Sequence, residues 1–245
     1  MGASTPASWG WRVWNTLQLA YTVAWTAGCI TLALLVLLAS GGNRRIPLRM
    51  ASRLWAPGLL SGAGAKLRVE GLERVDFTQP HVFVANHQSI IDICALFRAL
   101  PVPLRFVIKQ EIAKVPFIGR YARAMGMVFI ERGHAREAAE RLQGIVTIVR
   151  NGASLCAFPE GTRSRDGSVR PFKGGAFQVA LQAGVPVVPI AISGSSAVLP
   201  ASGFKVRPGT IRVRVGTPIS TTNLHAGDRH TLARAAHAAV VALMR

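Results

Sequence analysis

Residues 81–92 read His81-Val82-Phe83-Val84-Ala85-Asn86-His87-Gln88-Ser89-Ile90-Ile91-Asp92, and this stretch decides the fold. The apolar run His81–Ala85 is typical of a buried strand, and a helical pattern follows over Ile90–Ala99. In open α/β sheets, ligands and reactive groups gather where a strand gives way to a helix. The stretch therefore predicts an α/β fold with His87 and Asp92 at the edge of its sheet.

The rest of the chain after about residue 65 alternates short apolar runs with helical patterns in the same way. Strands are expected at Lys66–Glu70, His81–Ala85, Leu104–Lys109, Met127–Glu131, Ser154–Phe158, Val185–Ile192 and Thr210–Val215. Helices are expected at Ile90–Ala99, Pro116–Ala124, Ala135–Arg150, Gly174–Ala183 and Asp228–Met244. This alternation predicts one α/β domain in which helices cover a sheet.

The first 62 residues differ from the rest because they contain a long uncharged segment, between Arg12 and Arg44. About 20 predominantly apolar residues suffice to cross a hydrocarbon core. Aromatic side chains, which favour membrane interfaces, lie on its leading flank: Trp9, Trp11, Trp14 and Tyr21. We expect a membrane-anchoring segment over residues 1–62, with an apolar helix at about 16–40 and an amphipathic helix at about 47–60. A globular domain would fill residues 63–245.

The sequence leaves the form of this anchor open. The apolar helix could cross the membrane, or it could form a helical hairpin that dips into one leaflet. A cleaved signal peptide fits less well, because its apolar core would be shorter and its start more basic.

The charge balance favours an anionic partner. The chain has 29 lysines and arginines against 11 acidic residues, a formal net charge of +18. Few aromatic residues accompany the basic ones after the apolar segment, so an anionic membrane surface is favoured over a nucleic acid bound by stacking. Four arginines follow the apolar helix and one precedes it: Arg44, Arg45, Arg49 and Arg53 against Arg12. This bias predicts that the globular domain lies on the cytoplasmic side. We expect the membrane to be the cell inner membrane (plasma membrane).

His87 and Asp92 suit acid–base chemistry. A neutral imidazole can take a proton from a substrate hydroxyl, and a carboxylate on its other nitrogen would fix the tautomer and favour the imidazolium that forms. Four intervening residues across a loop-to-helix junction can bring the two side chains together. Alternatively, Asp92 caps the helix locally and His87 is a satisfied buried polar group.

A second stretch, Phe158-Pro159-Glu160-Gly161-Thr162-Arg163-Ser164-Arg165, offers a candidate anion site. Gly161 allows close backbone approach, Arg163 suits phosphate, and Thr162 adds a hydroxyl donor. Glu160 could hold Arg163 or hydrogen-bond a substrate hydroxyl. The alternative is a solvated basic turn.

Several other motifs are absent from the sequence. There is no GxSxG, no HExxH, no paired cysteine–histidine spacing, no P-loop and no GxGxxG entering a helix. These absences argue against a hydrolase serine, a zinc site and a nucleotide fold.

Taken together, these residues resemble the lysophospholipid acyltransferase family, of the 1-acylglycerol-3-phosphate acyltransferase type. Its four ordered blocks have counterparts here in Asn86–Asp92, Gly126–Arg132, Phe158–Ser164 and Val185–Ile190, with Lys109 and the stretch Lys114–Gly119 preceding the second. The likeness runs from about Val69 to Gly216. It implies a mixed sheet covered by helices, the glycerol-phosphate acyltransferase fold, with residues 63–245 as the acyltransferase domain.

The resemblance also implies roles for single residues. His87 would be the general base on the free glycerol hydroxyl, with Asp92 orienting it. The acceptor's phosphate would be bound by Glu160, Gly161, Thr162 and Arg163, with Lys109 and Arg132 adding charge. The hydroxyl would attack an acyl thioester directly, so that phosphatidic acid forms and coenzyme A or acyl carrier protein leaves. No metal, cofactor or covalent acyl-enzyme is implied.

Other functions remain open at this point. The acceptor could be another lysolipid, such as a lyso-ornithine lipid. From different classes, a membrane-bound thioester hydrolase or a non-catalytic lipid-binding protein would also fit part of the sequence.

Overall fold

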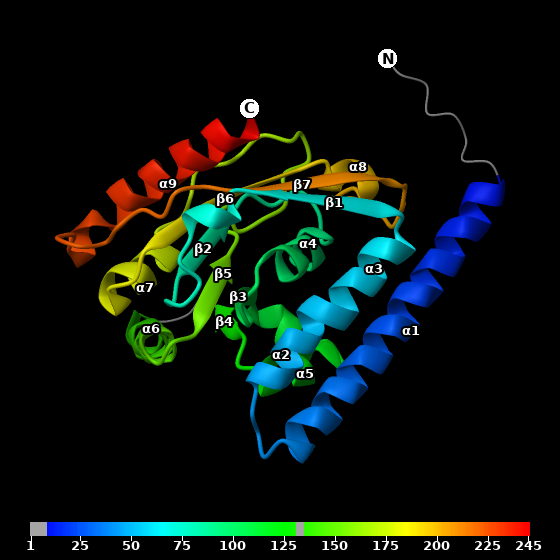
Figure 1. Ribbon diagram of the computed structural model, residues 1–245, viewed down its shortest axis with the longest axis horizontal. Coiled ribbons are helices and arrows are strands. Elements are labelled where there is room, and N and C mark those ends of the chain that lie inside the picture. Colours follow the sequence, from blue (N-terminus) through cyan, green and yellow to red (C-terminus); the bar gives the residue numbers. More distant parts are fainter. Residues whose placement is uncertain (1–8, 131–134) are drawn as a thin grey trace.

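A seven-stranded mixed sheet forms the centre of the protein in the computed structural model, which describes residues 9–130 and 135–245 (Figure 1). The strands are β1 (Ala65–Glu70), β2 (Val82–Ala85), β3 (Leu104–Lys109), β4 (Val128–Ile130), β5 (Ser154–Ala157), β6 (Val187–Ser193) and β7 (Gly209–Val215). Their order is β1-β7-β6-β2-β5-β3-β4. β6, β2, β5, β3 and β4 run parallel, whereas β7 is antiparallel to β6 and parallel to β1. The mixed sheet expected from the family resemblance is therefore confirmed.

Helices cover both faces of this sheet. The α-helices are α1 (Trp9–Ala39), α2 (Arg45–Met50), α3 (Ala56–Gly62), α4 (Asp92–Ala99), α5 (Ile118–Ala124), α6 (Ala135–Arg150), α7 (Gly175–Ala183), α8 (Ser195–Val198) and α9 (Arg229–Met244). A π-helical segment (Ala51–Trp55) joins α2 to α3, and short 3₁₀ helices are η2 (Leu72–Arg74), η3 (Gln110–Lys114) and η4 (Ala226–Asp228).

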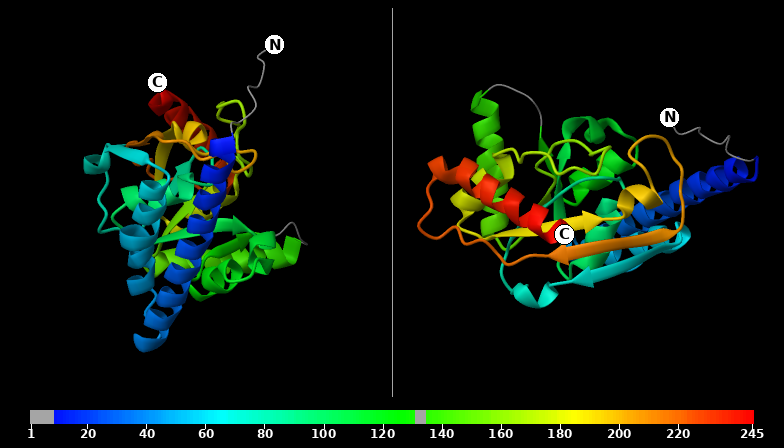
Figure 2. Two further views of the ribbon diagram at one scale, coloured as in Figure 1. Left: turned by 90° about the vertical axis from the view of Figure 1, so that its right-hand side faces the viewer. Right: turned by 90° about the horizontal axis from the view of Figure 1, so that it is seen from above.

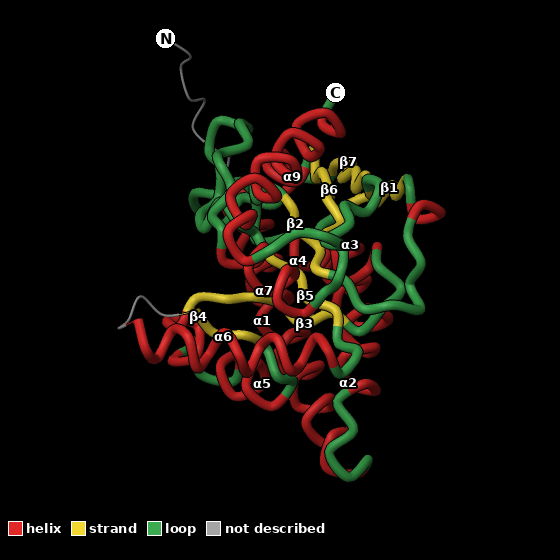
Figure 3. Tube along the Cα trace, turned by 90° about the vertical axis from the view of Figure 1, so that its left-hand side faces the viewer, coloured by secondary structure: helices red, strands yellow, loops and turns green. Residues whose placement is uncertain are grey.

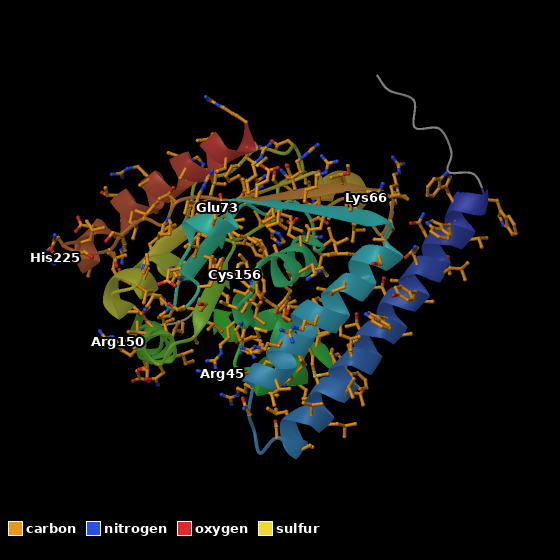
Figure 4. All side chains as sticks on the ribbon, viewed as in Figure 1. Arg45, Lys66, Glu73, Arg150, Cys156 and His225 are labelled. Carbon is orange, nitrogen blue, oxygen red and sulfur yellow. The ribbon has the colours of Figure 1, made fainter. Side chains whose placement is uncertain are left out.

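The strand side chains divide into two cores, one on each face. In β2, Phe83 and Ala85 pack in the core beneath α4 and α3, whereas Val82 and Val84 pack in the core with α7 and α9. All four residues are fully buried, as expected of a central parallel strand. Figure 4 shows Cys156 of the neighbouring β5 in the middle of the molecule.

The predicted elements all occur, most of them with shifted ends. The strand predicted from Val185 begins at Val187, because Val185 donates its N–H to Ala180 at the end of α7. The helix predicted from Ile90 begins at Asp92, because residues 89–91 form a turn. Residue 131, the end of another predicted strand, lies outside the described residues. The short helix α8 and the 3₁₀ helices were not predicted.

The N-terminal segment folds as a helical hairpin, in which α1 packs against a second helical arm (Figure 2). α1 begins at Trp9, earlier than the predicted residue 16, so its aromatic flank is itself helical. The second arm is continuous from Arg45 to Gly62, through the π-helical segment. Within the described chain, α1 is the one helix that is long and apolar enough to cross a membrane.

α1 has its polar side turned inward. Its buried residues are Gln18, Ile30 and Ala33, whereas leucines and valines on the opposite side are exposed. Hydrogen bonds join this inner side to the rest of the protein: Gln18 Nε2 to Gly62 O (2.6 Å), Tyr21 OH to Gly58 O (3.0 Å), Trp25 Nε1 to Trp55 O (3.2 Å) and Trp55 Nε1 to Thr26 Oγ1 (3.1 Å). An outward apolar face and an inward hydrogen-bonded face suit a lipid environment.

The loop after β2 is fixed to the neighbouring strand by one buried side chain. The Asn86 amide donates to Ile192 O (2.9 Å) and accepts from Ile192 N (2.7 Å), which closes the gap between the ends of β2 and β6. Asn86 is 1% exposed, so both bonds are shielded from water. His87 is the next residue, so these two hydrogen bonds also fix the position of its main chain.

We predict that Asn86→Ala destabilises the protein by about 2–4 kcal/mol, because both main-chain groups of Ile192 would be left buried without a partner. Urea unfolding of the protein in detergent would measure the change. The exposed Asn151, replaced by alanine, serves as the control and should lose under about 0.5 kcal/mol. Equal losses in the two variants would contradict the role assigned to the Asn86 amide.

Candidate active site

His87 and Asp92 are in direct contact. The His87 Nδ1 atom lies 2.9 Å from Oδ2 of Asp92, and the Asp92 side chain is fully buried. The carboxylate thus holds the tautomer in which Nδ1 carries the proton. The other ring nitrogen, Nε2, then has a free lone pair, and the imidazole keeps 16% of its side-chain surface exposed. This arrangement can accept a proton from a ligand.

The same oxygen of Asp92 also orders the loop. Oδ2 accepts the main-chain N–H groups of Gln88 and Ser89, each at 2.8 Å. Local capping and contact with His87, the two alternatives left by the sequence, therefore occur together on one atom. Oδ1 has no hydrogen-bond partner among the described residues.

Phe158 packs flat against the imidazole. The ring centroids lie 3.9 Å apart with an interplanar angle of 15°. Phe158 stacks in turn on Phe106, whose ring contacts Phe97. This row of rings fixes the imidazole plane and leads from it toward the interior of the protein.

Glu160 holds the main chain of His87. Its Oε1 accepts the His87 N–H (2.8 Å) and its Oε2 accepts the Arg170 N–H (3.0 Å), while Ser164 N donates to His87 O (2.7 Å). The side chain is buried, and burial raises the pKa of the Glu160 carboxyl although these hydrogen bonds oppose the rise. Both loops of the site are therefore joined through one carboxylate.

The other predicted anion-binding residues that the structure describes, Gly161, Thr162, Arg163 and Lys109, lie on the same edge of the sheet. β2, β5 and β3 are parallel neighbours, so their carboxyl ends place His87, the Glu160 loop and Lys109 along one edge. Gly161 has φ +74°, and a Cβ atom there would lie 2.7 Å from Nζ of Lys173. Glycine therefore keeps this ammonium group close to the loop.

Arg163, Thr162 and Lys109 are available to a ligand. Arg163 is half-buried, Thr162 and Lys109 are exposed, and none of the three side chains forms a hydrogen bond or ion pair within the described residues. Arg132, predicted to add charge here, lies outside those residues. No group of three metal-ligating side chains occurs in the described part of the chain, and the absence of a metal requirement stays a prediction.

An apolar cavity of about 370 Å³ starts beside the His87 loop. Ile90, Ile91 and Phe106 line the end near the site, and residues of α1, the second arm of the hairpin, α4 and α5 line the rest. Its volume falls within the range of small-molecule sites. The arrangement combines a proton acceptor, cationic side chains and a long apolar space.

Sequence reasoning assigned no role to two residues that shape this site. Asn86 and Phe158 lie within the two quoted stretches, close to residues that were singled out. Their contacts join positions far apart in the chain, such as Asn86 with Ile192, and no local pattern signals them.

Comparisons with known proteins place these features in context. A family model described as Acyltransferase matches residues 66–193. A chloroplastic 1-acyl-sn-glycerol-3-phosphate acyltransferase of Brassica napus is 36% identical over 203 residues, 79% of this chain and 58% of that protein. The enzyme of the same name from Saccharomyces cerevisiae is 35% identical over 164 residues, 66% of this chain and 54% of that protein. The chain thus matches between half and two thirds of the length of these relatives.

A solved structure confirms the fold. The crystal structure of the 1-acyl-sn-glycerophosphate (LPA) acyltransferase PlsC from Thermotoga maritima is similar, with a TM-score of 0.78 at 24% identity. The similarity covers 96% of this chain and 98% of that one, so it includes the hairpin as well as the sheet.

We predict that Glu160→Gln changes how stability depends on pH. Because burial raises the pKa of this carboxyl, the folded protein holds the proton more tightly than the unfolded chain does. The stability contributed by Glu160 is present below the usual glutamate pKa and is lost as the pH rises through the raised value. The unfolding free energy of the wild type minus that of the variant should therefore fall as the pH rises above about pH 4.

Chemical unfolding at a series of pH values measures this difference. Glu73→Gln is the matched control, because the Glu73 side chain is 75% exposed, and its difference curve should stay flat. A difference in unfolding free energy that stays constant or rises with pH for Glu160→Gln would show that burial does not raise the pKa of the Glu160 carboxyl.

Proposed function

Because the chain belongs to the acyltransferase family, whose model matches residues 66–193, we propose that it transfers a fatty acyl group from an acyl thioester to the free sn-2 hydroxyl of 1-acyl-glycerol-3-phosphate. The product is phosphatidic acid, a precursor of phospholipids. The contact of His87 Nδ1 with buried Asp92 carries the proposal, because it leaves Nε2 free to accept a hydroxyl proton. Acyl coenzyme A or acyl carrier protein serves as co-substrate, and no cofactor or metal takes part.

The chemistry is a direct transfer in a ternary complex. The acceptor oxygen attacks the thioester carbonyl while its proton moves to His87 Nε2, and Asp92 stabilises the resulting imidazolium. The tetrahedral intermediate then collapses, the C–S bond breaks, and the proton passes from the imidazolium to the thiolate sulfur. The ester bond forms without an acyl-enzyme.

Arg163, Thr162 and Lys109 bind the acceptor's phosphate in this proposal, and Gly161 allows the loop to approach it. Arg132 is proposed for the same role on sequence alone. Glu160 acts differently, because its two carboxylate oxygens already accept main-chain N–H groups. It holds the loop that binds the phosphate, and this accounts for a carboxylate beside an anionic ligand.

The apolar cavity is proposed to hold a fatty acyl chain. It begins at Ile90 and Ile91, close to the imidazole, and extends between α1, α4 and α5. A chain seated there would bring its carbonyl carbon toward the His87 loop.

The hairpin is proposed to seat the protein in one leaflet of the cell inner membrane, on its cytoplasmic side. Asn15 near one end of α1 accepts the N–H of Val206, and Arg44 just beyond the other end donates to Ala124. The globular domain therefore holds α1 at both ends. If α1 crossed the membrane, part of the globular domain would have to enter the hydrocarbon core. The exposed Arg45, Arg49 and Arg53 would meet anionic head groups.

We predict that His87→Ala lowers the transfer rate by about 10²–10⁴-fold, because the general base is lost. The purified protein would be given a labelled acyl thioester, on either carrier, with 1-acyl-glycerol-3-phosphate or a lyso-ornithine lipid, and diacyl product would be measured. Unchanged fold and membrane association should accompany the loss. Full activity of this variant would contradict the base assignment, and thioester loss without a diacyl product in the wild type would indicate a hydrolase.

We predict that Arg163→Ala raises the KM for the phosphate-bearing acceptor about 10- to 100-fold, the cost of losing charge-assisted hydrogen bonds. Steady-state kinetics with each substrate varied in turn would measure it. Arg68→Ala, an exposed site on β1 at the opposite end of the sheet, should leave both KM values unchanged. A rise in the thioester KM alone would move Arg163 to the donor site.

A further inference from the structure

Phe117 occupies an unusual backbone conformation. Its φ is +59° and its ψ is −55°, and the N–H of Ile118 bonds to the carbonyl of Pro116 at 2.6 Å. Phe117 is therefore the central residue of a γ-turn of the rare positive-φ kind, which is strained for any residue with a side chain. Such strain persists where the surrounding structure fixes it, and it often marks a functional position.

The strain is not offset by burial of the ring. Phe117 is 62% exposed, and its neighbours Val115 and Ile118 are 38% and 42% exposed. The turn thus presents three apolar side chains to the outside. We call residues 115–118 the apolar turn.

Close packing beneath the apolar turn holds it rigid. Gly119 N donates to Val115 O (2.8 Å), and the backbone of Gly119 lies so close to the carbonyl of Ala113 that a Cβ atom would overlap it. Arg123 donates to the same carbonyl (2.9 Å). The ring of Phe117 is therefore held outward by the backbone and does not hang from a loose loop.

The apolar turn lies next to the proposed membrane face. α5, which follows it, contacts α1 and lies beside α2 (Figure 3). Ile118 shares the lining of the apolar cavity with Ile30 and Ala33 of α1. Ile118, a residue of the turn itself, lines the cavity and remains 42% exposed, so the cavity lining reaches the protein surface at the turn.

Basic residues surround the apolar tip. Lys114 precedes it, Arg120 and Arg123 follow it on α5, and all three are exposed, against one acidic neighbour, Glu111. An apolar tip with a basic rim matches a bilayer surface, where rings enter the acyl region and cations meet anionic phosphates.

We propose that the apolar turn is a second membrane-inserting element, which enters the same leaflet as the outer face of α1 and sets the cavity mouth against the acyl region. The partner is an anionic phospholipid bilayer. Continuity with the exposed leucines of α1 and the basic rim favour lipid over a protein surface. The proposal rests on the membrane placement of α1 given above.

The depth of residue 117 in a bilayer tests the proposal. The full chain would carry Cys29→Ala, since the other two thiols, Cys94 and Cys156, are buried. Single variants Phe117→Cys, Leu35→Cys or His225→Cys would then carry an environment-sensitive fluorophore. Vesicles of equal parts phosphatidylcholine and phosphatidylglycerol would contain lipids with a spin label on the acyl chain, which quenches fluorophores in the acyl region.

Each position has a separate meaning. Leu35 is 58% exposed on α1 and reports the membrane placement of the hairpin. His225 lies at the end of the molecule far from α1 and should not be quenched (Figure 4). Quenching at 117 and 35 supports the proposal. Quenching at 35 without quenching at 117 overturns it, whereas absence of quenching at 35 rejects the membrane placement itself.

Two substitutions at Phe117 distinguish the contribution of its ring to membrane docking from its contribution to the fold. Phe117→Gly removes the ring and relaxes the strained turn, whereas Phe117→Leu keeps an apolar side chain. We expect Phe117→Gly to raise the apparent KM for a vesicle-embedded acceptor about tenfold and to leave the rate with a water-soluble short-chain acceptor unchanged. Phe117→Leu should behave like the wild type.

Three results would overturn the proposal. Wild-type behaviour of Phe117→Gly with vesicles would show that the ring contributes nothing to docking. Equal losses with both acceptors would indicate a defect in the site or the fold. A higher KM for acyl carrier protein alone would assign the apolar turn to a protein partner.

Discussion

One oxygen atom, Oδ2 of buried Asp92, holds the candidate site together. It accepts hydrogen bonds from the imidazole of His87 and from the main-chain N–H groups of Gln88 and Ser89. A single carboxylate oxygen thus fixes both the orientation of the ring and the path of the loop. These three hydrogen bonds restrain the loop from His87 to Ser89. Glu160 repeats this principle one strand away, because its two oxygens join the His87 and Arg170 main chains.

Local sequence was sufficient to predict the strands and most helices. β-branched runs bounded by turns located β3 at Leu104–Lys109 without error, and helical spacing located α6 at Ala135–Arg150. The His87–Asp92 contact was also predictable, because only four residues separate the two across a loop-to-helix junction. The bonds that join distant segments were not, and the amide of Asn86 illustrates this, since Ile192 lies 106 residues further on.

Two errors had identifiable physical causes. The start of α1 was predicted seven residues late, because the leading tryptophans were taken as a flank although aromatic residues also fit a helix. The strained turn at Phe117 had no signal, since positive φ is normally marked by glycine or asparagine. Tertiary contacts impose that conformation, and a reading of local propensity has no access to them.

The hydrogen bonds on the inner face of α1 also affect how freely the sequence of the second arm can change during evolution. Gln18, Tyr21 and Trp25 all donate to main-chain oxygens of the second arm, at Gly62, Gly58 and Trp55. Every amino acid supplies such an oxygen, so most side chains of that arm can change during evolution without loss of these bonds. The exceptions are Gly58 and Gly62, where a Cβ atom would overlap the rings of Trp25 and Tyr21. Sequence drift in the second arm should therefore be broad but interrupted at two glycines spaced one helical turn apart.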